Sequence, residues 1–272
     1  MTTINAYRMD GLGNDFIIVD RRKNSINISR ERIIELGRRD VLGFDQIIFI
    51  EDEQNQSFPI TIYNSDGGEV SACGNGSRCV AYLLTKEMNL KTIQLKTNNR
   101  LLEAEVVGNL LVKLNMGKPE FQWEKIPLIK DLNHQKINLE IDNIKFSNGF
   151  CLNVGNPHIV FFEENCFKHD LKRIGPKIEN HVIFPEKVNV TFAQVEDNKN
   201  ILINVWERGA GLTKACGTAA CATAVAAIRK NLSDNKVNIK FKEGILIIQY
   251  KDKENIFMTG PVSEVKKIEI EI

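Results

Sequence analysis

The chain has 272 residues, of which 36 are basic and 35 acidic, so its net charge is +1. A chain of this length buries a sizeable core, as one large domain or as two of about 100–150 residues each. Because neither sign of charge dominates, we expect no nucleic-acid partner and no membrane surface as partner. The first residues contain no basic segment followed by an apolar one. The longest apolar run is well short of the roughly 18 residues that span a bilayer. We therefore expect a cytoplasmic protein.

Strand-like runs precede and follow one helix in the first half of the chain. Runs rich in isoleucine and valine predict strands at 17–22, 45–51 and 58–64. Residues 74–88 carry apolar side chains at helical spacing. Three further runs then predict a meander, at 92–97, 101–107 and 110–116.

The second half repeats this order of elements. Strands are expected at 158–162, 188–195 and 201–207, then a helix after Cys216, then strands at 237–241, 245–250 and 256–260. The alternating segment 265–272 has no counterpart in the first half, and we expect it to return as a strand to the first domain. The polar stretches 120–148 and 163–187 are interpreted as loops and edge elements.

Two Ala-Cys-Gly motifs reveal an internal repeat. Cys216 follows Cys73 by 143 positions (216 − 73). The same offset, or one position less, relates three further pairs: Gln46 and Asn189, Asn64 and Glu207, and Asn14 and Asn156. Matching offsets in the same order indicate two halves of common architecture. We predict that residues 1–118 form one domain, closed by 263–272, and that residues 119–262 form the other.

The six cysteines are expected to be free thiols, because the chain is neither small nor visibly secreted. No two of them form a Cys-x2-Cys pair, and the four histidines do not stand at zinc spacing beside them, so no metal site is expected. Four cysteines are interpreted as core residues: Cys79, Cys151, Cys166 and Cys221.

The other two cysteines, Cys73 and Cys216, stand where a glycine-containing turn meets a helix start. The first N–H groups of a helix have no intrahelical acceptor and lie at the positive end of the helix dipole. A thiol at this position is expected to have a lowered pKa, and a carboxylate is expected to bind the N–H groups. These N–H groups belong to Gly74, Asn75, Gly217 and Thr218.

Two such thiols facing one cleft suit inversion of configuration at the α-carbon of an amino acid. One face of the carbon requires a base and the opposite face an acid. The developing negative charge spreads onto the substrate carboxylate, which the helix N-termini stabilise. Because an unperturbed thiol has a pKa of about 8.5, both of its forms are accessible near neutrality. This chemistry requires no pyridoxal phosphate and no other cofactor.

The remaining polar residues of the repeat are candidate substrate ligands. Amide groups donate to carboxylates, and an arginine holds a carboxylate with two hydrogen bonds. Glu207 is a candidate acceptor for the substrate ammonium group. The candidate donors are Asn14, Asn64, Asn156, Asn189 and Arg208.

Four motifs resemble the diaminopimelate epimerase family, whose members interconvert LL- and meso-2,6-diaminoheptanedioate without a cofactor. The motifs are "DGLGNDFIIVD" (10–20), "YNSDGGEVSACGNGSRC" (63–79), "NVGNPHIVFF" (153–162) and "WERGAGLTKACGTAACA" (206–222). They stand in family order and at family-like spacing from near the start of the chain to the second helix.

The resemblance implies an α+β fold of two pseudo-symmetric domains, each a β-barrel-like sheet around a central helix, with the active site in the interdomain cleft. It implies an isomerase of lysine and peptidoglycan precursor biosynthesis that acts on diaminopimelate, without a cofactor and as a homodimer. Cys73 and Cys216 would be the acid/base thiols. The implied carboxylate-binding residues are Gly74, Asn75, Gly217 and Thr218. The implied ligands for the rest of the substrate are Asn14, Asn64, Asn156, Asn189, Glu207 and Arg208, with a lesser role for Gln46 and a positioning role for His158.

Two other interpretations are kept. One is a cofactor-independent racemase or epimerase of another amino acid, since Leu212 and Ala219 depart from residues common beside the second thiol. Proline racemases also use two cysteines, but they carry histidine after the first Cys-Gly, where this chain has Asn75. The other interpretation, from a different class, is a thiol redox or zinc-binding module.

Overall fold

The computed structural model describes residues 2–24, 26–71, 73–98 and 100–272, and the chain divides into two compact units. Unit 1 comprises Met1–Asn115 and Thr259–Ile272, and unit 2 comprises Met116–Met258. Ala72, within the motif that contains Cys73, lies outside the described residues. Over the described ranges, no helix combines the length and the apolar character that crossing a membrane requires.

Unit 1 contains a mixed sheet and two helices, α1 (Arg30–Gly37) and α2 (Gly74–Met88). Its strands are β1 (Thr3–Asp10), β2 (Asp15–Asp20), β3 (Gln46–Ile50), β4 (Phe58–Asn64), β5 (Glu69–Val70), β6 (Thr92–Lys96), β7 (Leu101–Gly108), β8 (Leu111–Asn115) and β18 (Lys266–Glu271). The pairing order is β18–β1–β2–β3–β4–β6–β7–β8, and the short β5 also pairs with β4. The β2–β3 and β4–β6 pairings are parallel, and the others are antiparallel.

Unit 2 likewise contains a mixed sheet and two helices, α3 (Leu171–Glu179) and α4 (Gly217–Arg229). Its strands are β9 (Ile137–Ile141), β10 (Ile144–Asn153), β11 (Pro157–Phe162), β12 (Asn189–Asp197), β13 (Asn200–Glu207), β14 (Gly211–Leu212), β15 (Lys236–Phe241) and β16 (Gly244–Gln249). They pair in the order β9–β10–β11–β12–β13–β15–β16, with β14 on β13. The division between the units falls within β17 (Phe257–Pro261).

The two units repeat one sequence of strand pairings. Along β1–β2–β3–β4–β6–β7 the pairings alternate antiparallel and parallel, beginning and ending antiparallel. The same alternation runs along β10–β11–β12–β13–β15–β16. In each unit the long helix comes between the fourth and fifth strands of this series. The pseudo-symmetry predicted from the spacing of the motifs is therefore confirmed.

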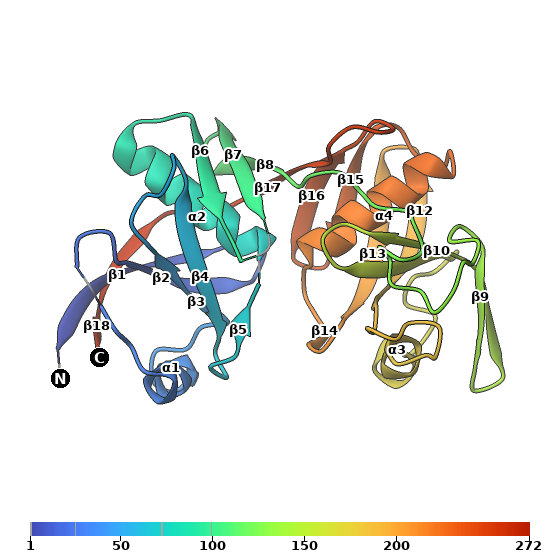
Figure 1. Ribbon diagram of the computed structural model, residues 1–272, viewed down its shortest axis with the longest axis horizontal. Coiled ribbons are helices and arrows are strands. Elements are labelled where there is room, and N and C mark those ends of the chain that lie inside the picture. Colours follow the sequence, from blue (N-terminus) through green and yellow to red (C-terminus); the bar gives the residue numbers. More distant parts are fainter. Residues whose placement is uncertain (1, 25, 72, 99) are drawn as a thin grey trace. The chain divides into compact units, whose positions relative to one another are not determined.

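Each sheet curves around its long helix, as Figure 1 shows within each unit. Helix α2 contacts β1 near one end of its sheet and also β6, β7 and β8 at the other end. Helix α4 likewise contacts β10 and β16, near opposite ends of the strand order in unit 2. The alanines of α4 allow these contacts, because small side chains let strands approach the helix from several sides. Those from Ala219 to Ala227 are buried.

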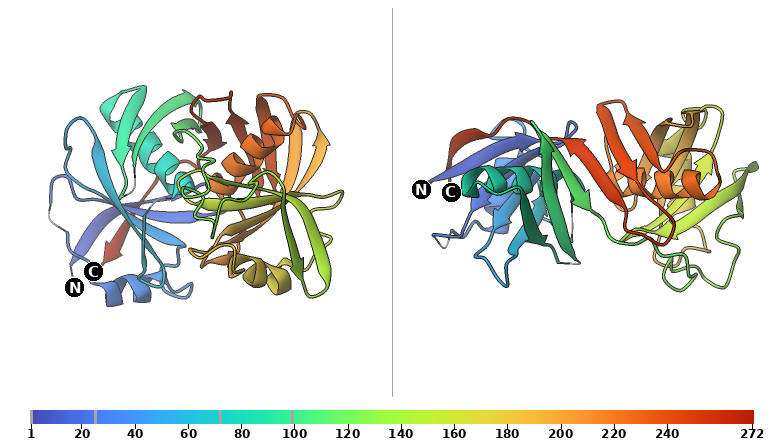
Figure 2. Two further views of the ribbon diagram at one scale, coloured as in Figure 1. Left: turned by 45° about the vertical axis from the view of Figure 1, so that its right-hand side comes forward. Right: turned by 90° about the horizontal axis from the view of Figure 1, so that it is seen from above.

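The C-terminal segment pairs with the N-terminal strand. Strand β18 lies antiparallel to β1, with Thr3 opposite Glu271 and Arg8 opposite Lys266. The two views in Figure 2 show the red C-terminal strand beside the blue N-terminal one, with both chain ends at the same end of the pair.

The interpretation of residues 163–187 as loops and edge elements is wrong for α3. This helix buries Leu171, Ile174 and Ile178 at helical spacing, and its N-cap Asp170 accepts a hydrogen bond from the Lys172 N–H at 3.1 Å. Pro176 inside the helix concealed it, because proline usually breaks helices. Strand β1 and helix α1 also lie outside the predicted elements.

Candidate active site

Cys73 is the N-cap of α2 in unit 1. Its Sγ accepts a hydrogen bond from the Gly76 N–H at 3.4 Å, and its carbonyl accepts one from the Ser77 N–H at 2.8 Å. Gly76 allows a close approach here, since a Cβ at that position would lie 2.5 Å from Ile48 Cδ1. The first turn of α2 therefore packs directly on β3. The Cys73 side chain, at the N-terminal end of α2, is partly exposed.

Three predicted polar ligands of unit 1 lie at neighbouring strand ends. Gln46 opens β3 and Asn64 closes β4, and the two face each other in the antiparallel register. The Gln46 Nε2 donates to Asn64 Oδ1 at 2.9 Å. Asn14 precedes β2, the parallel neighbour of β3, and its carbonyl accepts from the Gly11 N–H at 3.0 Å.

Gly11 connects this group to the start of α2. A Cβ on Gly11 would lie 3.2 Å from the carbonyl oxygen of Asn75 and 3.3 Å from its Cβ. The turn that carries Asn14 is therefore in contact with the first helical turn after Cys73. The structure thus brings together the predicted site residues of unit 1: Asn14, Gln46, Asn64, Cys73, Gly74 and Asn75.

Cys216 is the corresponding N-cap of α4 in unit 2. Its carbonyl accepts from the Ala220 N–H at 3.0 Å, and its Sγ lies 3.4 Å from Thr218 Oγ1. The residue is only 5% exposed, and its thiol lies close enough to the Glu207 carboxyl group, at the end of β13, for that charge to act on it.

The expectation of a lowered thiol pKa is wrong for Cys216. Burial raises the pKa of this thiol well above its ordinary value, and the negative charge of Glu207 raises it further. The Thr218 hydroxyl, 3.4 Å from the sulfur, and the nearby Ala219 N–H act in the opposite direction but do not compensate. The sequence showed the helix N-terminus but not the depth of burial, and desolvation dominates. Burial also raises the pKa of Glu207, although the nearby Thr213 hydroxyl and Cys216 thiol reduce the effect.

The remaining predicted residues of unit 2 form one hydrogen-bonded group. The His158 Nε2–H donates to Asn156 Oδ1 at 2.9 Å. Asn189 Nδ2 donates to the Pro157 carbonyl at 2.7 Å, and Asn189 Oδ1 accepts from the Arg208 N–H at 2.9 Å. The Arg208 side chain is anchored by a 2.9 Å hydrogen bond from Nη1 to a backbone carbonyl.

His158 is fully buried, and burial together with the nearby Arg208 charge lowers its pKa to about 3. It is therefore neutral near pH 7. Its hydrogen bond to Asn156 Oδ1 leaves the amide NH₂ of Asn156 as the end available to a ligand. The His158 ring therefore fixes which end of the Asn156 amide faces it.

Glu179 is a contributor that the sequence interpretation missed. It is buried at the end of α3 and accepts hydrogen bonds from Trp206 Nε1 at 2.7 Å and from the Gly209 N–H at 3.0 Å. These two donors flank Glu207 and Arg208, so Glu179 holds the turn that presents them. Its position within a stretch interpreted as loop concealed this role.

The four remaining cysteines are confirmed as buried. Cys79 donates from Sγ to the Asp10 carbonyl at 3.5 Å, and burial raises the pKa values of Cys79, Cys151 and Cys166. Within the described ranges, no cluster of three histidine, cysteine or acidic side chains has the geometry to hold a metal ion.

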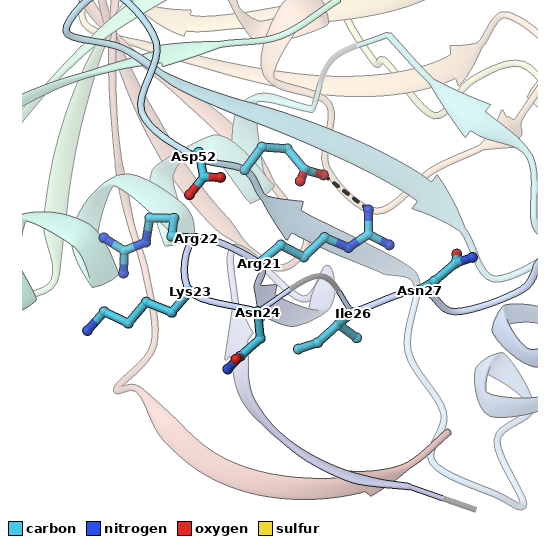
Figure 3. Close-up of a pocket in the computed structure, with 8 residues that line it drawn as sticks. Arg21, Arg22, Lys23, Asn24, Ile26, Asn27 and Asp52 are labelled. Carbon is cyan, nitrogen blue, oxygen red and sulfur yellow. Dashed lines mark hydrogen bonds and ion pairs between the residues drawn. The ribbon is translucent and has the colours of Figure 1, made fainter.

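A cavity of about 460 Å³ in unit 1 is a separate feature (Figure 3). None of the predicted site residues lines it. Its two arginines are paired locally, since Arg21 Nη1 lies 3.1 Å from Glu51 Oε1 and Arg22 Nη2 lies 2.7 Å from Asp20 Oδ2 and 2.6 Å from Glu87 Oε2. Figure 3 shows Arg22 and Lys23 extending away from the guanidinium of Arg21. The two arginines of this cavity are therefore already engaged with carboxylates of the protein.

The chain is similar to known proteins over nearly its whole length. The family model for diaminopimelate epimerase matches residues 6–122 and 150–265. Diaminopimelate epimerase from Pelagibacter ubique is 48% identical over 272 residues, covering 99% of both chains. The enzyme of that name from Caulobacter vibrioides is 37% identical, covering 94% of this chain and 93% of its own.

Solved structures share the fold at low sequence identity. A PhzF-family phenazine biosynthesis protein from Bacillus anthracis has a TM-score of 0.70 and 16% identity, and the match covers 100% of both chains. A hydroxyproline epimerase from Agrobacterium vitis has a TM-score of 0.68 and 10% identity, covering 98% of this chain and 92% of its own. These likenesses confirm the predicted two-domain α+β fold.

Proposed function

The chain belongs to the diaminopimelate epimerase family, and from this premise we propose which of its residues carry the reaction. The protein is an isomerase that interconverts LL- and meso-2,6-diaminoheptanedioate, a step of lysine biosynthesis. Its small-molecule substrate carries an ammonium group and a carboxylate at each end. The proposal concerns how the two half-sites bind this substrate and move its α-proton.

Cys73 and Cys216 are the two acid/base groups. The observation that carries this assignment is their equivalent position, since each thiol is the N-cap of the long helix in its unit. Inversion requires that both thiols reach one α-carbon, from opposite faces. One thiolate removes the α-proton and the other thiol returns a proton to the opposite face.

The two thiols have different surroundings. From this difference we assign the protonation state in which each thiol begins a turnover. Cys216 lies beside the Glu207 carboxyl group and has a raised pKa, so it begins a turnover as the protonated acid. Cys73 is partly exposed and accepts an N–H hydrogen bond at its sulfur, which favours the thiolate. Turnover in the reverse direction begins from the opposite protonation state.

The substrate carboxylate at the reacting carbon binds the helix N-termini. The backbone N–H groups of Gly74 and Asn75, and those of Gly217 and Thr218, lie in the first turns of α2 and α4 and have no intrahelical acceptors. They stabilise the charge that develops on the carboxylate when the α-proton leaves. No external cofactor is needed for this step.

The rest of the substrate binds the polar residues of the two units. Glu207 accepts from an ammonium group, and Arg208 together with the Asn156 NH₂ donates to a carboxylate. Asn189 binds both the Arg208 backbone and the Pro157 carbonyl, so it mainly fixes the position of Arg208. In unit 1, Asn64 and Asn14 are ligands, and Gln46 orients Asn64. The homodimer implied by the sequence resemblance stays a prediction.

Selective alkylation tests the placement of the first thiol. Cys73 is partly exposed, whereas the other five cysteines are buried. We expect iodoacetamide to modify Cys73 alone in the native protein and to abolish activity, and we expect diaminopimelate to slow both effects. Peptide mass spectrometry locates the label, and Cys73→Ala is the control that should take up none. Unchanged labelling at saturating substrate would contradict the assignment.

A further inference from the structure

We propose that Asp45 is a positioning residue that turns the amide of Asn14 so that its Oδ1 accepts a hydrogen bond from a substrate ammonium group. The inference rests on the substrate-binding role proposed above for Asn14. It changes the chemistry expected of that residue from donor toward a carboxylate to acceptor toward an ammonium group.

The contact between the two side chains has only one possible direction. Asn14 Nδ2 lies 3.0 Å from Asp45 Oδ2. A carboxylate only accepts hydrogen bonds, so the end of the amide that faces it must be the NH₂ group. The amide pair of Gln46 and Asn64 carries no such constraint, since either amide can donate to the other. Asp45 therefore decides which end of Asn14 is turned toward the protein.

The carboxylate of Asp45 is held firmly by a network of charges. Its Oδ2 also accepts from the Asp15 N–H at 3.1 Å. Arg39 donates to Asp45 and also to both carboxylate oxygens of Asp15, at 3.1 and 3.0 Å. Arg8 Nη2 donates to Asp15 Oδ2 at 2.8 Å. Burial raises the pKa of Asp15, but hydrogen bonds from Arg39 and Arg8 and the positive charge of Arg39 hold that pKa below its ordinary value.

The backbone places these groups at one edge of the sheet. Asp15 opens β2, and Asp45 immediately precedes β3, its parallel neighbour. The Asp45 N–H donates to the Asp15 carbonyl at 3.0 Å, and the Asp45 carbonyl accepts from the Ser65 N–H at 3.0 Å. Hydrogen bonds to the neighbouring chain segments on both sides thus fix the backbone from which the Asp45 side chain extends.

The other end of the Asn14 amide remains available to a ligand. Asn14 is partly exposed, and within the described ranges no donor forms a hydrogen bond with its Oδ1. The substrate has two ammonium groups, whereas Glu207 is so far the sole acceptor assigned to them. A neutral amide oxygen held toward the substrate supplies a second acceptor without adding another charge.

The first test compares two aspartates of the same segment. Asp40 is exposed and paired with Arg38 at 2.6 Å, and it has no contact with Asn14, which makes Asp40→Asn the matched control. An amide at 45 can donate as well as accept, so it no longer fixes which end of Asn14 faces the substrate. We therefore expect Asp45→Asn to raise KM for diaminopimelate about tenfold, with kcat changed less than about threefold because the contact serves substrate and transition state alike. Asp40→Asn should leave both constants unchanged. Equal KM values for Asp45→Asn and the wild type would overturn the inference.

Exchanging the side chains at positions 14 and 45 distinguishes whether Asn14 accepts a hydrogen bond from the substrate or donates one to it. In Asn14→Asp combined with Asp45→Asn, the amide at 45 donates to the carboxylate at 14, which then presents an oxygen to the substrate. We expect this double variant to recover KM to within about threefold of the wild type. If Asn14 instead donated to a substrate carboxylate, the exchange would place like charges together, and a KM above that of Asp45→Asn would overturn the inference.

Asn14→Ala provides a second test, because it removes the proposed substrate contact and by itself leaves the ion-pair network intact. We expect Asn14→Ala alone to raise KM about tenfold, and we expect Asp45→Asn to add no further rise in that background. A further tenfold rise would show that Asp45 acts only on the structure. Thermal denaturation of each variant measures folding. The alanine variants of Cys73 and Cys216 test the proposed site separately, so the failure of one proposal is distinguishable from failure of the other.

Discussion

Replacement of either Cys73 or Cys216 by alanine is expected to lower kcat/KM for epimerisation by about 10³-fold or more, since each variant loses an acid/base group. KM should change little, because neither thiol is proposed to bind the substrate in its ground state. Chiral chromatography of the LL and meso isomers measures the rate in both directions. The two losses should be of similar size, because each direction of the reaction uses both thiols.

The chain supplies matched controls for these variants. Cys79 lies six residues after Cys73 in α2, and Cys221 lies five residues after Cys216 in α4. Both are buried without a proposed chemical role. Cys79→Ala and Cys221→Ala should keep activity within about threefold of the wild type while lowering stability by about 1 kcal/mol. An active Cys73→Ala or Cys216→Ala variant would contradict the two-thiol mechanism.

Glu207→Gln is expected to lower kcat/KM about 100-fold, because it removes the charged acceptor proposed for a substrate ammonium group. It should also change the pH dependence of the reaction. The Glu207 charge raises the pKa of Cys216, so its removal lowers that pKa, although burial still holds it above its ordinary value.

The direction of the pH effect follows from the role of Cys216 as acid. In the direction of turnover in which Cys216 is the acid, this role requires the protonated thiol, so kcat/KM for that direction falls as the pH rises through the pKa of Cys216. The alkaline fall in kcat/KM should therefore begin at lower pH in Glu207→Gln than in the wild type. Glu196→Gln is the control, because Glu196 belongs to a surface pair with Lys240 in the same unit. An unchanged alkaline limb in Glu207→Gln would contradict the assigned contact.

Much of the fold followed from spacing in the sequence. The offset between Cys73 and Cys216 is shared, to within one position, by three other residue pairs. It predicted two halves of one architecture, and the repeated strand pairings confirm this prediction. Helix α3 was missed because Pro176 interrupts its pattern, although Leu171, Ile174 and Ile178 already stand at helical spacing. Tertiary packing on the core of unit 2 stabilises this helix, and that contribution cannot be read locally.

The sequence predicts a set of candidate site residues but not the electrostatics around them. The motifs identify Cys216 and Glu207, yet their positions in sequence do not show that the thiol is buried against the carboxyl group. The same limit applies to Asp45 and Glu179, which act on Asn14 and on the turn after Trp206 through contacts between distant segments. Such contacts depend on the fold, so no local pattern reveals them.

The fate of deuterium in heavy water tests the two-thiol mechanism most directly. A thiol carries a single proton, and in D₂O the acid thiol of the free enzyme carries deuterium. At low conversion of the LL isomer, the meso product should therefore contain one deuterium at the inverted α-carbon, and the recovered LL isomer should contain almost none. Mass spectrometry of the separated isomers measures both. Deuterium appearing equally in recovered substrate and product, as one shared base would produce, would contradict the account.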